Sequence, residues 1–309
     1  MANLILVHEV GRQDRADYEE IARLIAAADR GISVYVVDTK EIDWPAAARA
    51  RESPCLTVSP MPAKKFVPPR GPLLQGHNYR KSEQYPRLQR LGLRVPRWSL
   101  VGPGTALDPR DWGPYVVVKP DLGAKGAEIR IKRTGRVRHH PPERYPADHP
   151  ARKAPLMAQQ FVYTGRWPVN YRVVTLFGRT LMGWRCEANH RFEPLGSRWD
   201  FRARGGITVV SNKRDSSYRL CFERDIVELA QAAHAAFPDQ PLLGTDIVRD
   251  ADTGELFVLE CNPRGDVWLL SSDMGRKIEA ANGLDFKAQL GALGIAAEVL
   301  ASVARERAA

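Results

Sequence analysis

The chain has 309 residues, of which 44% are hydrophobic. At roughly 150 residues per domain this length predicts about two domains, and the apolar content suffices for buried cores, which excludes fibrous, collagenous and disordered classes. The 46 Lys and Arg residues outnumber the 36 Asp and Glu residues, and the net charge of +10 favours anionic partners such as phosphates, carboxylates or nucleic acid.

Neither a membrane span nor a signal peptide is predicted. No apolar run approaches the roughly 18 residues of a spanning helix, and the N-terminal run reaches His8 and Glu9 too early for a signal peptide. The cysteines are too scattered for zinc knuckles. We therefore expect a cytoplasmic protein with reduced thiols at Cys55, Cys186, Cys221 and Cys261.

The first segment alternates between strand and helix patterns. Leu4–Val7 is an apolar run, Ala16–Ala28 has helical spacing, and Ile32–Val37 is rich in β-branched residues, which together predict a parallel βαβ unit. The loop after the first run lacks GxGxxG, so nothing there argues for a dinucleotide. Prolines between residues 54 and 72 predict short strands before a domain boundary near residue 75.

The rest of the chain is β-rich with a few helices. A helix over Tyr79–Leu91 is expected to end at Gly92, a second helix covers Glu223–Ala236, and the Ala-rich tail from Asp285 is helical. The predicted strands are Tyr115–Val118, Ile129–Lys132, Met157–Val162, Tyr171–Phe177, Thr180–Glu187, Ile207–Val210, Leu242–Arg249 and Leu256–Asn262. The pattern predicts an α/β N-terminal domain followed by an α+β fold.

The last two strands form a hairpin that brings polar side chains together. If the turn centres on Thr253, Asp246 and Glu260 lie directly opposite each other, because both are equally distant from it. Side chains alternate along a strand, so Glu260 and Asn262 share a face while Cys261 points away. Such hard oxygen donors suit Mg²⁺.

Two other interpretations of this hairpin are possible. A calcium-binding EF-hand starting at Asp250 fails, since its sixth and twelfth positions are Glu255 and Cys261 rather than Gly and Glu. Asp246 and Glu260, considered alone, fit ordinary polar residues on a solvated strand face as well as they fit a metal site. The solvated interpretation weakens because both lie among apolar residues, where an unpaired carboxylate is costly.

A phosphate-binding end is indicated further upstream. The strand Val116–Val118 runs into Lys119 and then into a loop with Gly123, Lys125 and Gly126. A lysine at a strand exit meets phosphates as a point charge, and glycine lets backbone N–H groups approach them, although a solvated hairpin explains the same residues. No GxxxxGK[ST] P-loop is present.

Polar motifs follow one another between residues 76 and 275. Lys81 precedes the helix that ends before Gly92 and Pro96, and Lys119 ends its strand; then come Gln159-Gln160-Phe161-Val162, Asn170-Tyr171-Arg172, Arg185, and Arg202 and Arg204 beside a glycine pair. With the Asp246, Glu260 and Asn262 hairpin, this order and spacing resemble the ATP-grasp superfamily, closest to its RimK-like amino-acid and peptide ligases.

The resemblance implies a role for each motif. The implied magnesium ligands are Asp246, Glu260 and Asn262; the implied nucleotide contacts are Lys81, Lys119, Gly123, Lys125, Gly126, the hinge Gln159, Gln160, Phe161 and Val162, and Asn170; the implied catalytic arginines are Arg172, Arg185, Arg202 and Arg204. Glutamines in the hinge and Asn170 depart from the glutamate and aspartate common in the family, which leaves ATP against GTP open.

The resemblance also implies a division of the chain. Residues 1–75 would be the pre-ATP-grasp βαβ domain, and residues 76–284 the ATP-grasp domain with a lid subdomain at about 115–162. Residues 285–309 would form a C-terminal helix.

The implied reaction is ATP-dependent, with Mg²⁺ as two ions for which Mn²⁺ can substitute. A carboxylate is activated to an acyl phosphate and attacked by an amine, which gives an amide or peptide bond, ADP and phosphate. Arginine forks suit an acyl phosphate or a substrate carboxylate. The carboxylate and the amine, whether free amino acids, peptides or proteins, stay undetermined, as does homo-oligomerisation.

Three alternatives remain open. An ATP-grasp kinase or carboxylate–thiol ligase would share the catalytic core, and a catalytically dead nucleotide sensor is disfavoured by the complete Asp, Glu and Asn set. A nucleic-acid binder is suggested by the basic stretch 130–140, which lacks interleaved aromatic residues, so a solvated basic surface is preferred.

Trp184, Trp199 and Trp268 are candidates for an acceptor pocket, although core packing is the commoner fate of tryptophan.

Overall fold

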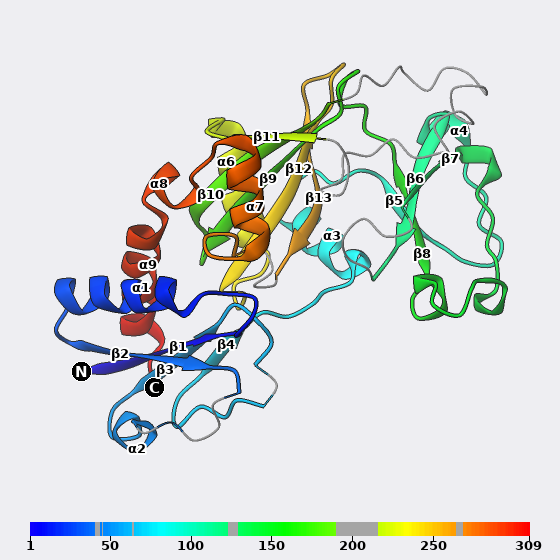
Figure 1. Cartoon of the computed structure of the whole chain (residues 1–309). Helices are drawn as coiled ribbons and strands as arrows, with labels where there is room; N and C mark the ends of the chain where they lie inside the picture. Colours follow the sequence, from blue (N-terminus) through cyan, green and yellow to red (C-terminus); the bar gives the residue numbers. More distant parts are fainter. Residues whose placement is uncertain (41–43, 45, 64, 123–128, 190–215, 264–267) are drawn as a thin grey trace.

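The computed structural model describes residues 1–40, 44, 46–63, 65–122, 129–189, 216–263 and 268–309. Their strands form one parallel sheet followed in the chain by two antiparallel sheets (Figure 1). The predicted α/β domain followed by an α+β fold is confirmed. Among these residues, no helix is both long and apolar enough to cross a membrane.

The N-terminal sheet has the strand order β2-β1-β3-β4 and is parallel throughout. Its strands are β1 (Ala2–His8), β2 (Ile32–Asp38), β3 (Cys55–Ser59) and β4 (Leu73–Gln75). Helix α1 (Arg15–Ala28) makes the predicted βαβ crossover, and a short helix α2 (Ala47–Ala50) precedes β3. The Asp14 carboxylate caps α1 by accepting a hydrogen bond from the Ala16 backbone N–H at 3.0 Å.

The smaller antiparallel sheet has the order β5-β8-β6-β7. Its strands are β5 (Trp98–Val101), β6 (Tyr115–Pro120), β7 (Arg130–Arg133) and β8 (Leu156–Gln160), and a short helix α4 (Pro109–Trp112) packs beside β6. Sequence analysis missed β5 because four residues are too few to show a period. The sheet therefore begins at Trp98, ahead of the expected lid start near residue 115.

The larger antiparallel sheet has the order β11-β10-β9-β12-β13. Its strands are β9 (Val169–Leu176), β10 (Arg179–Ala188), β11 (Ser216–Leu220), β12 (Leu242–Arg249) and β13 (Leu256–Asn262), and the last two match their predicted bounds. Helix α6 (Arg224–His234) covers one face. The expected strand Ile207–Val210 lies outside the described residues, and β11 was not expected.

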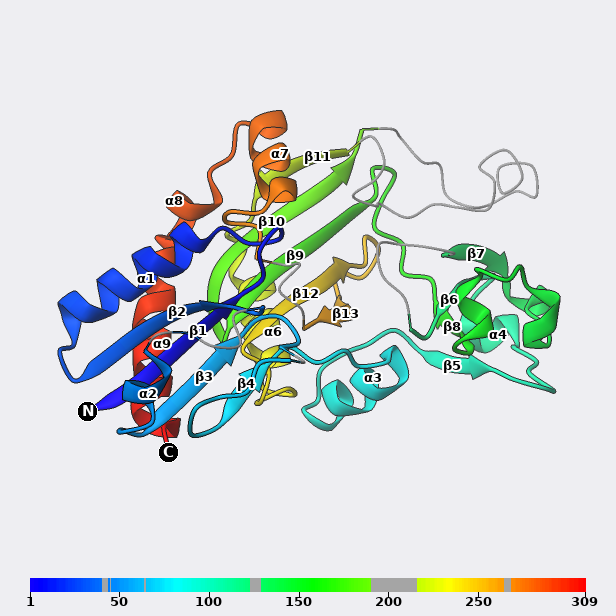
Figure 2. The ribbon, with the colours of Figure 1, turned by 60° about the horizontal axis from the view of Figure 1, so that its bottom comes forward.

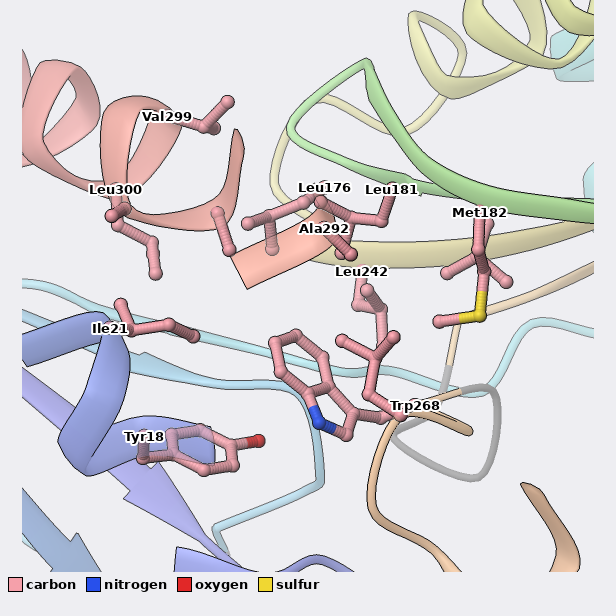
Figure 3. Close-up of a cluster of buried hydrophobic side chains, with 14 of the residues drawn as sticks. Tyr18, Ile21, Leu176, Leu181, Met182, Leu242, Trp268, Ala292, Val299 and Leu300 are labelled. Atoms are coloured by element: carbon pink, nitrogen blue, oxygen red, sulfur yellow. The ribbon is translucent and has the colours of Figure 1, made fainter. Parts of the chain in front are cut away.

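The opposite face of the large sheet shares a core with the N-terminal sheet (Figure 3). Helix α9 (Ala292–Arg307) packs against α1, β1 and β10 at once, which joins the two sheets. Helices α7 (Asp273–Asn282) and α8 (Phe286–Leu290) precede it. The tail expected as one helix is broken at Gly291, whose φ of 65° suits glycine. The domain boundaries at residues 75 and 284 stay a prediction.

Trp184 and Trp268 belong to this shared core and are 2% and 1% exposed. Trp268 stacks on Tyr18 and donates a hydrogen bond from its indole N–H to Asp17 at 3.0 Å. Both tryptophans therefore have the core role that sequence analysis weighed against an acceptor pocket, and Trp199 lies outside the described residues. All four cysteines are buried free thiols, as expected.

Helix α3 (Lys81–Arg90) lies between the two antiparallel sheets (Figure 2). The Asp121 carboxylate, just after β6, accepts hydrogen bonds from the Ser82 backbone N–H and hydroxyl, both at 2.8 Å. A carboxylate at a helix N-terminus satisfies free N–H groups and suits the helix dipole, so it fixes the start of α3 against the small sheet. The helix ends at Arg90, and Gly92, with φ of 72°, follows it as the predicted left-handed cap.

Gly76 stands where the chain leaves the N-terminal sheet and allows no side chain. A Cβ atom there would lie 2.4 Å from the Pro60 backbone oxygen and 2.5 Å from that of Pro263. Because Pro263 directly follows Asn262, this close approach ties the connection to the end of β13.

Candidate functional site

The β12–β13 hairpin has the predicted pairing at its far end: Asp246 lies opposite Glu260. Nearer the turn, however, Arg249 pairs with Leu256 and Ile247 with Val258, which centres the turn between Asp252 and Thr253. A β-bulge at Leu259 restores the pairing of Asp246 with Glu260. The expected register is therefore confirmed at the polar end, but through a bulge that sequence analysis did not foresee.

The two faces of β13 differ in character. Cys261 and Val258 both pack into a core with Tyr85 of α3, as expected for Cys261. Glu260 and Asn262 lie on the other face, where the Asn262 amide donates to the Asp246 carboxylate at 3.1 Å and to the Gly244 backbone oxygen at 3.3 Å. The predicted oxygen donors thus stand together.

Arg172 of β9 holds the Asp246 carboxylate with both prongs of its guanidinium. The two residues are direct partners across β9 and β12, and the N–O distances are 2.5 and 2.6 Å. Such a bidentate pair fixes both partners in one geometry. The Arg172 guanidinium also lies 5.8 Å from the centre of the Trp184 ring, which supports it from the core side.

Lys81, at the first turn of α3, forms the second ion pair of the site. Its ammonium lies 3.1 Å from a Glu260 carboxylate oxygen, and the two side chains are 7% and 26% exposed. Two carboxylates of the hairpin are thus each neutralised by a cation from another element, Lys81 from α3 and Arg172 from β9.

Lys119, at the end of β6, has a different environment. Its ammonium donates to the Tyr85 hydroxyl at 3.0 Å and lies 3.4 Å from the Leu259 backbone oxygen, the group that the bulge presents. Burial, and then the neighbouring charge of Lys81, lowers the pKa of Lys119 to about 7. This lysine is therefore close to losing its proton at neutral pH.

Of the four hinge residues, Gln159 contacts this group of residues through the Tyr85 hydroxyl. Gln159 is buried and its side-chain oxygen accepts a hydrogen bond from the Tyr85 hydroxyl at 2.8 Å, while Gln160 pairs with Arg97 through its backbone N–H at 2.8 Å. Phe161 and Val162 follow as half-buried residues. Asn170 lies two residues before Arg172 on β9 and so shares its face.

Arg185 does not join this group, contrary to the expectation. It pairs with Tyr171 across β9 and β10, on the face covered by α6, and its guanidinium lies 2.9 Å from Glu187. Arg172, one residue from Tyr171, points to the opposite face. The remaining expected residues, Gly123, Lys125, Gly126, Arg202 and Arg204, lie outside the described residues.

Sequence analysis missed Tyr85 and Asp121. Tyr85 lies four residues after Lys81, so both occupy the same side of α3, and this helical spacing was the available signal. Asp121 is 1% exposed and caps the helix that carries both. The sequence near Lys119 gives no signal for this capping role of Asp121, because its partner Ser82 reaches it only when α3 docks.

The arrangement combines two kinds of charged group at short range. In the part of the chain that the structure describes, no cluster of three or more His, Cys, Asp and Glu residues is placed to hold a metal ion. Asp246, Glu260 and Asn262 instead offer two carboxylates and one amide oxygen, a hard donor set that fits Mg²⁺ with water or phosphate in the remaining positions. Lys81, Lys119 and Arg172 offer positive charge beside it.

Comparison with solved structures identifies the fold. The D-cycloserine synthetase DcsG matches with 18% identity and a TM-score of 0.52, over 98% of this chain and 99% of that one. The ATP-grasp ligase PsnB, with a phosphomimetic variant of its minimal precursor, Mg and ADP, matches with 16% identity and a TM-score of 0.51, over 97% and 98%.

A ligase described as RiPP-associated and ATP-grasp, from Chryseobacterium gregarium with ADP and a leader and core peptide, matches with 9% identity and a TM-score of 0.50, over 99% of this chain and 97% of that one. No protein-family model and no curated protein matches the chain. At these identities the likeness establishes the fold alone: the chain has the ATP-grasp fold over nearly its whole length.

Proposed function

We propose that this protein is an ATP-dependent, Mg²⁺-dependent carboxylate–amine ligase of the RimK-like type. The observation that carries the proposal is that two cations pair with two adjacent carboxylates, Lys81 with Glu260 and Arg172 with Asp246, at one end of the large sheet. The ATP-grasp fold supports it.

These two adjacent ion pairs fit a ligand that carries both positive and negative charge. A bare anion would compete with Glu260 for Lys81, and a bare metal ion would compete with Lys81 for Glu260, so each would leave an unpaired group behind. A metal–nucleotide complex offers phosphate to the cations and a divalent ion to the carboxylates together. It can therefore replace both ion pairs without leaving a charge unmatched.

Asp246, Glu260 and Asn262 would hold the magnesium, as two ions or one, with Mn²⁺ able to substitute. When bound, the metal supplies charge neutralisation for the transferring phosphoryl group. The chain's own contribution is to hold these oxygens on adjacent strands, where the pairing of Asp246 with Glu260 beside the bulge at Leu259 sets their spacing.

The cations of the site would position the nucleotide and stabilise negative charge. Lys81 and Lys119 would contact phosphates, together with Gly123, Lys125 and Gly126, and Arg172, Arg202 and Arg204 would hold phosphate or the substrate carboxylate. Gln159, Gln160, Phe161, Val162 and Asn170 would meet the base and ribose. Because Arg185 lies on the sheet face covered by α6, we do not propose a phosphate contact for it.

The proposed reaction has two steps. A substrate carboxylate oxygen attacks the terminal phosphorus of ATP and ADP leaves; then an amine nitrogen attacks the acyl carbon, phosphate leaves, and the amine loses a proton. The PsnB and Chryseobacterium gregarium structures contain precursor, leader or core peptides. We therefore include amino acids and peptides among the substrates to be tested.

The test is an ADP-release screen over pairs of carboxylates and amines, with mass spectrometry of the products. We expect ADP release that needs both partners and Mg²⁺, and a product whose mass is the sum of the partners less one water. A phosphorylated carboxylate or alcohol as the final product would indicate a kinase, and a thioester would indicate a carboxylate–thiol ligase. Binding of ATP without any product would favour a nucleotide sensor.

A further inference from the structure

Tyr85 is the buried centre of a polar network that the proposed reaction does not yet use. Its ring is fully buried on α3, and its hydroxyl contacts groups from three strands: Lys119 of β6, Gln159 of β8 and Leu259 of β13. One hydroxyl therefore links the helix between the two sheets to both of them.

The hydroxyl has a single proton and two acceptors for it. The Leu259 backbone oxygen lies at 2.7 Å and the Gln159 side-chain oxygen at 2.8 Å. Burial keeps the phenol neutral, because it raises the pKa of Tyr85 well above its usual value. Since the proton is directed to these acceptors, a lone pair of the hydroxyl is left to face the Lys119 ammonium at 3.0 Å.

Lys119 depends on this hydroxyl for its direction. Lys81 is held by the Glu260 carboxylate, but within the described residues Lys119 has no carboxylate at salt-bridge distance. Its nearer hydrogen-bond acceptor is the Tyr85 hydroxyl, since the Leu259 oxygen lies at 3.4 Å. A flexible, buried ammonium with one short neutral contact keeps its place only while that contact is present.

We propose that Tyr85 is a positioning residue, whose hydroxyl aims the Lys119 ammonium at the nucleotide phosphates. The inference rests on the proposed nucleotide role of Lys119 and deepens it. The bulge at Leu259 belongs to the same device, because it presents the carbonyl that takes the Tyr85 proton.

Tyr85→Phe isolates the hydroxyl. The phenylalanine ring keeps the edge contact with Trp98, at 5.5 Å between centroids. It also keeps the contact between the ring and the Lys119 nitrogen, which lies 5.6 Å from the ring centroid. Tyr79→Phe is the matched control. Tyr79 lies two residues before the helix, and its hydroxyl accepts a hydrogen bond from Gln240 at 3.4 Å, away from Lys119.

The experiment is a double-mutant cycle on nucleotide affinity, measured by calorimetric titration of the full chain with MgADP. We expect Tyr85→Phe to weaken binding by about tenfold, the scale of a hydrogen bond to a charged group, and Tyr79→Phe to leave it unchanged. In a Lys119→Met background the same Tyr85→Phe change should alter affinity by less than about twofold, because the group it aims is absent.

The outcomes separate the two proposals. If the wild-type chain does not bind MgADP, the proposed function fails. If it binds and Tyr85→Phe has the same effect with and without Lys119, the hydroxyl acts on general structure and the positioning role is overturned. Equal affinity of Tyr85→Phe and wild type overturns it as well. Melting temperatures of all four proteins of the cycle check that each remains folded.

Discussion

The site has two sides that differ in how charge is balanced. The hairpin side consists of Asp246 and Glu260 with their partners Arg172 and Lys81, and the lysine side consists of Lys119 and its neighbour Tyr85. On the hairpin side, the carboxylates of Asp246 and Glu260 are each matched by a cation at hydrogen-bond distance. On the lysine side, the Lys119 ammonium makes its hydrogen bonds to neutral groups, the Tyr85 hydroxyl and the Leu259 backbone oxygen. The carboxylates of the hairpin side are therefore paired before a ligand binds, while Lys119 has no carboxylate at salt-bridge distance among the described residues.

The difference indicates how the binding energy of a nucleotide would be distributed. Replacing an ion pair by another ion pair gains little, because one charge partner is exchanged for another. Supplying a phosphate to a buried lysine without a carboxylate partner gains more, because that ammonium is poorly stabilised beforehand. The hairpin side would thus contribute mainly geometry and the lysine side mainly affinity.

The largest effect is expected from Glu260→Gln on the hairpin side. Loss of this carboxylate removes a proposed metal ligand and the partner of Lys81, so Mg²⁺-dependent turnover should fall about 10²-fold or more. Steady-state ADP release measures it. The matched control is Glu255→Gln in the same hairpin, where an exposed carboxylate pairs with Arg94 at 2.9 Å, and its turnover should not change. Unchanged turnover of Glu260→Gln would remove the metal assignment.

Methionine substitutions of Lys81 and Lys119 should affect stability differently. Both Lys81→Met and Lys119→Met should weaken nucleotide affinity, but only Lys81→Met leaves a half-buried carboxylate unpaired. Its free energy of unfolding without ligand should fall by about 1–3 kcal/mol, whereas Lys119→Met should be as stable as wild type or more stable. Urea unfolding measures both. An exposed Lys153→Met variant is the control, and equal losses at the two sites would contradict the contrast.

The pH dependence of the free energy of unfolding should report the lowered pKa of Lys119. The unfolded pKa of lysine is about 10.4, and burial lowers that of Lys119 to about 7 in the folded chain. Between these values the unfolded chain binds more protons, so the free energy of unfolding should rise with pH from about 7 toward 10. The rise should be smaller in Lys119→Met. Urea unfolding at pH 7 and pH 9 tests this, and identical pH slopes in both proteins would count against it.

The smallest effect is expected from the basic stretch. Arg130, Lys132 and Arg133 lie on the edge strand β7, with Arg136 and Arg138 directly after it. Neutralising all five should leave turnover nearly unchanged, and wild-type binding to single-stranded DNA should be weak and vanish near physiological salt. Salt-dependent titration measures it. Submicromolar binding that survives excess MgATP and is lost in the variant would restore the nucleic-acid interpretation.

Local sequence patterns were sufficient for much of the fold and part of the site. The βαβ unit, the helix before Gly92 and the bounds of β12 and β13 follow from periodicity and turn residues within short windows. The face shared by Asp246, Glu260 and Asn262 follows from strand alternation. The motif order also indicated the ATP-grasp fold that the comparisons support.

Two β-bulges set which sheet faces Arg185 and Glu260 occupy, which strand alternation alone does not determine. Continuing the pairing of Thr180 with Thr175 would put Arg185 opposite Asn170, on the face of Arg172. The irregularity between Thr180 and Met182 shifts Arg185 opposite Tyr171 and so to the α6 face. In β13 the bulge at Leu259 had the reverse effect and restored the pairing of Asp246 with Glu260.

The position of each bulge depends on residues far away in the sequence. Leu181 and Met182 are neighbours, yet both are fully buried in the core that the large sheet shares with α1 and α9, which a regular strand would not allow. In β13 the bulge lets Val258 and Cys261 pack in the same core beside Tyr85. Alternation is a local property of the strand backbone, so it can be predicted from the sequence. Which face each residue occupies could not be predicted, because burial against distant helices set the two bulges.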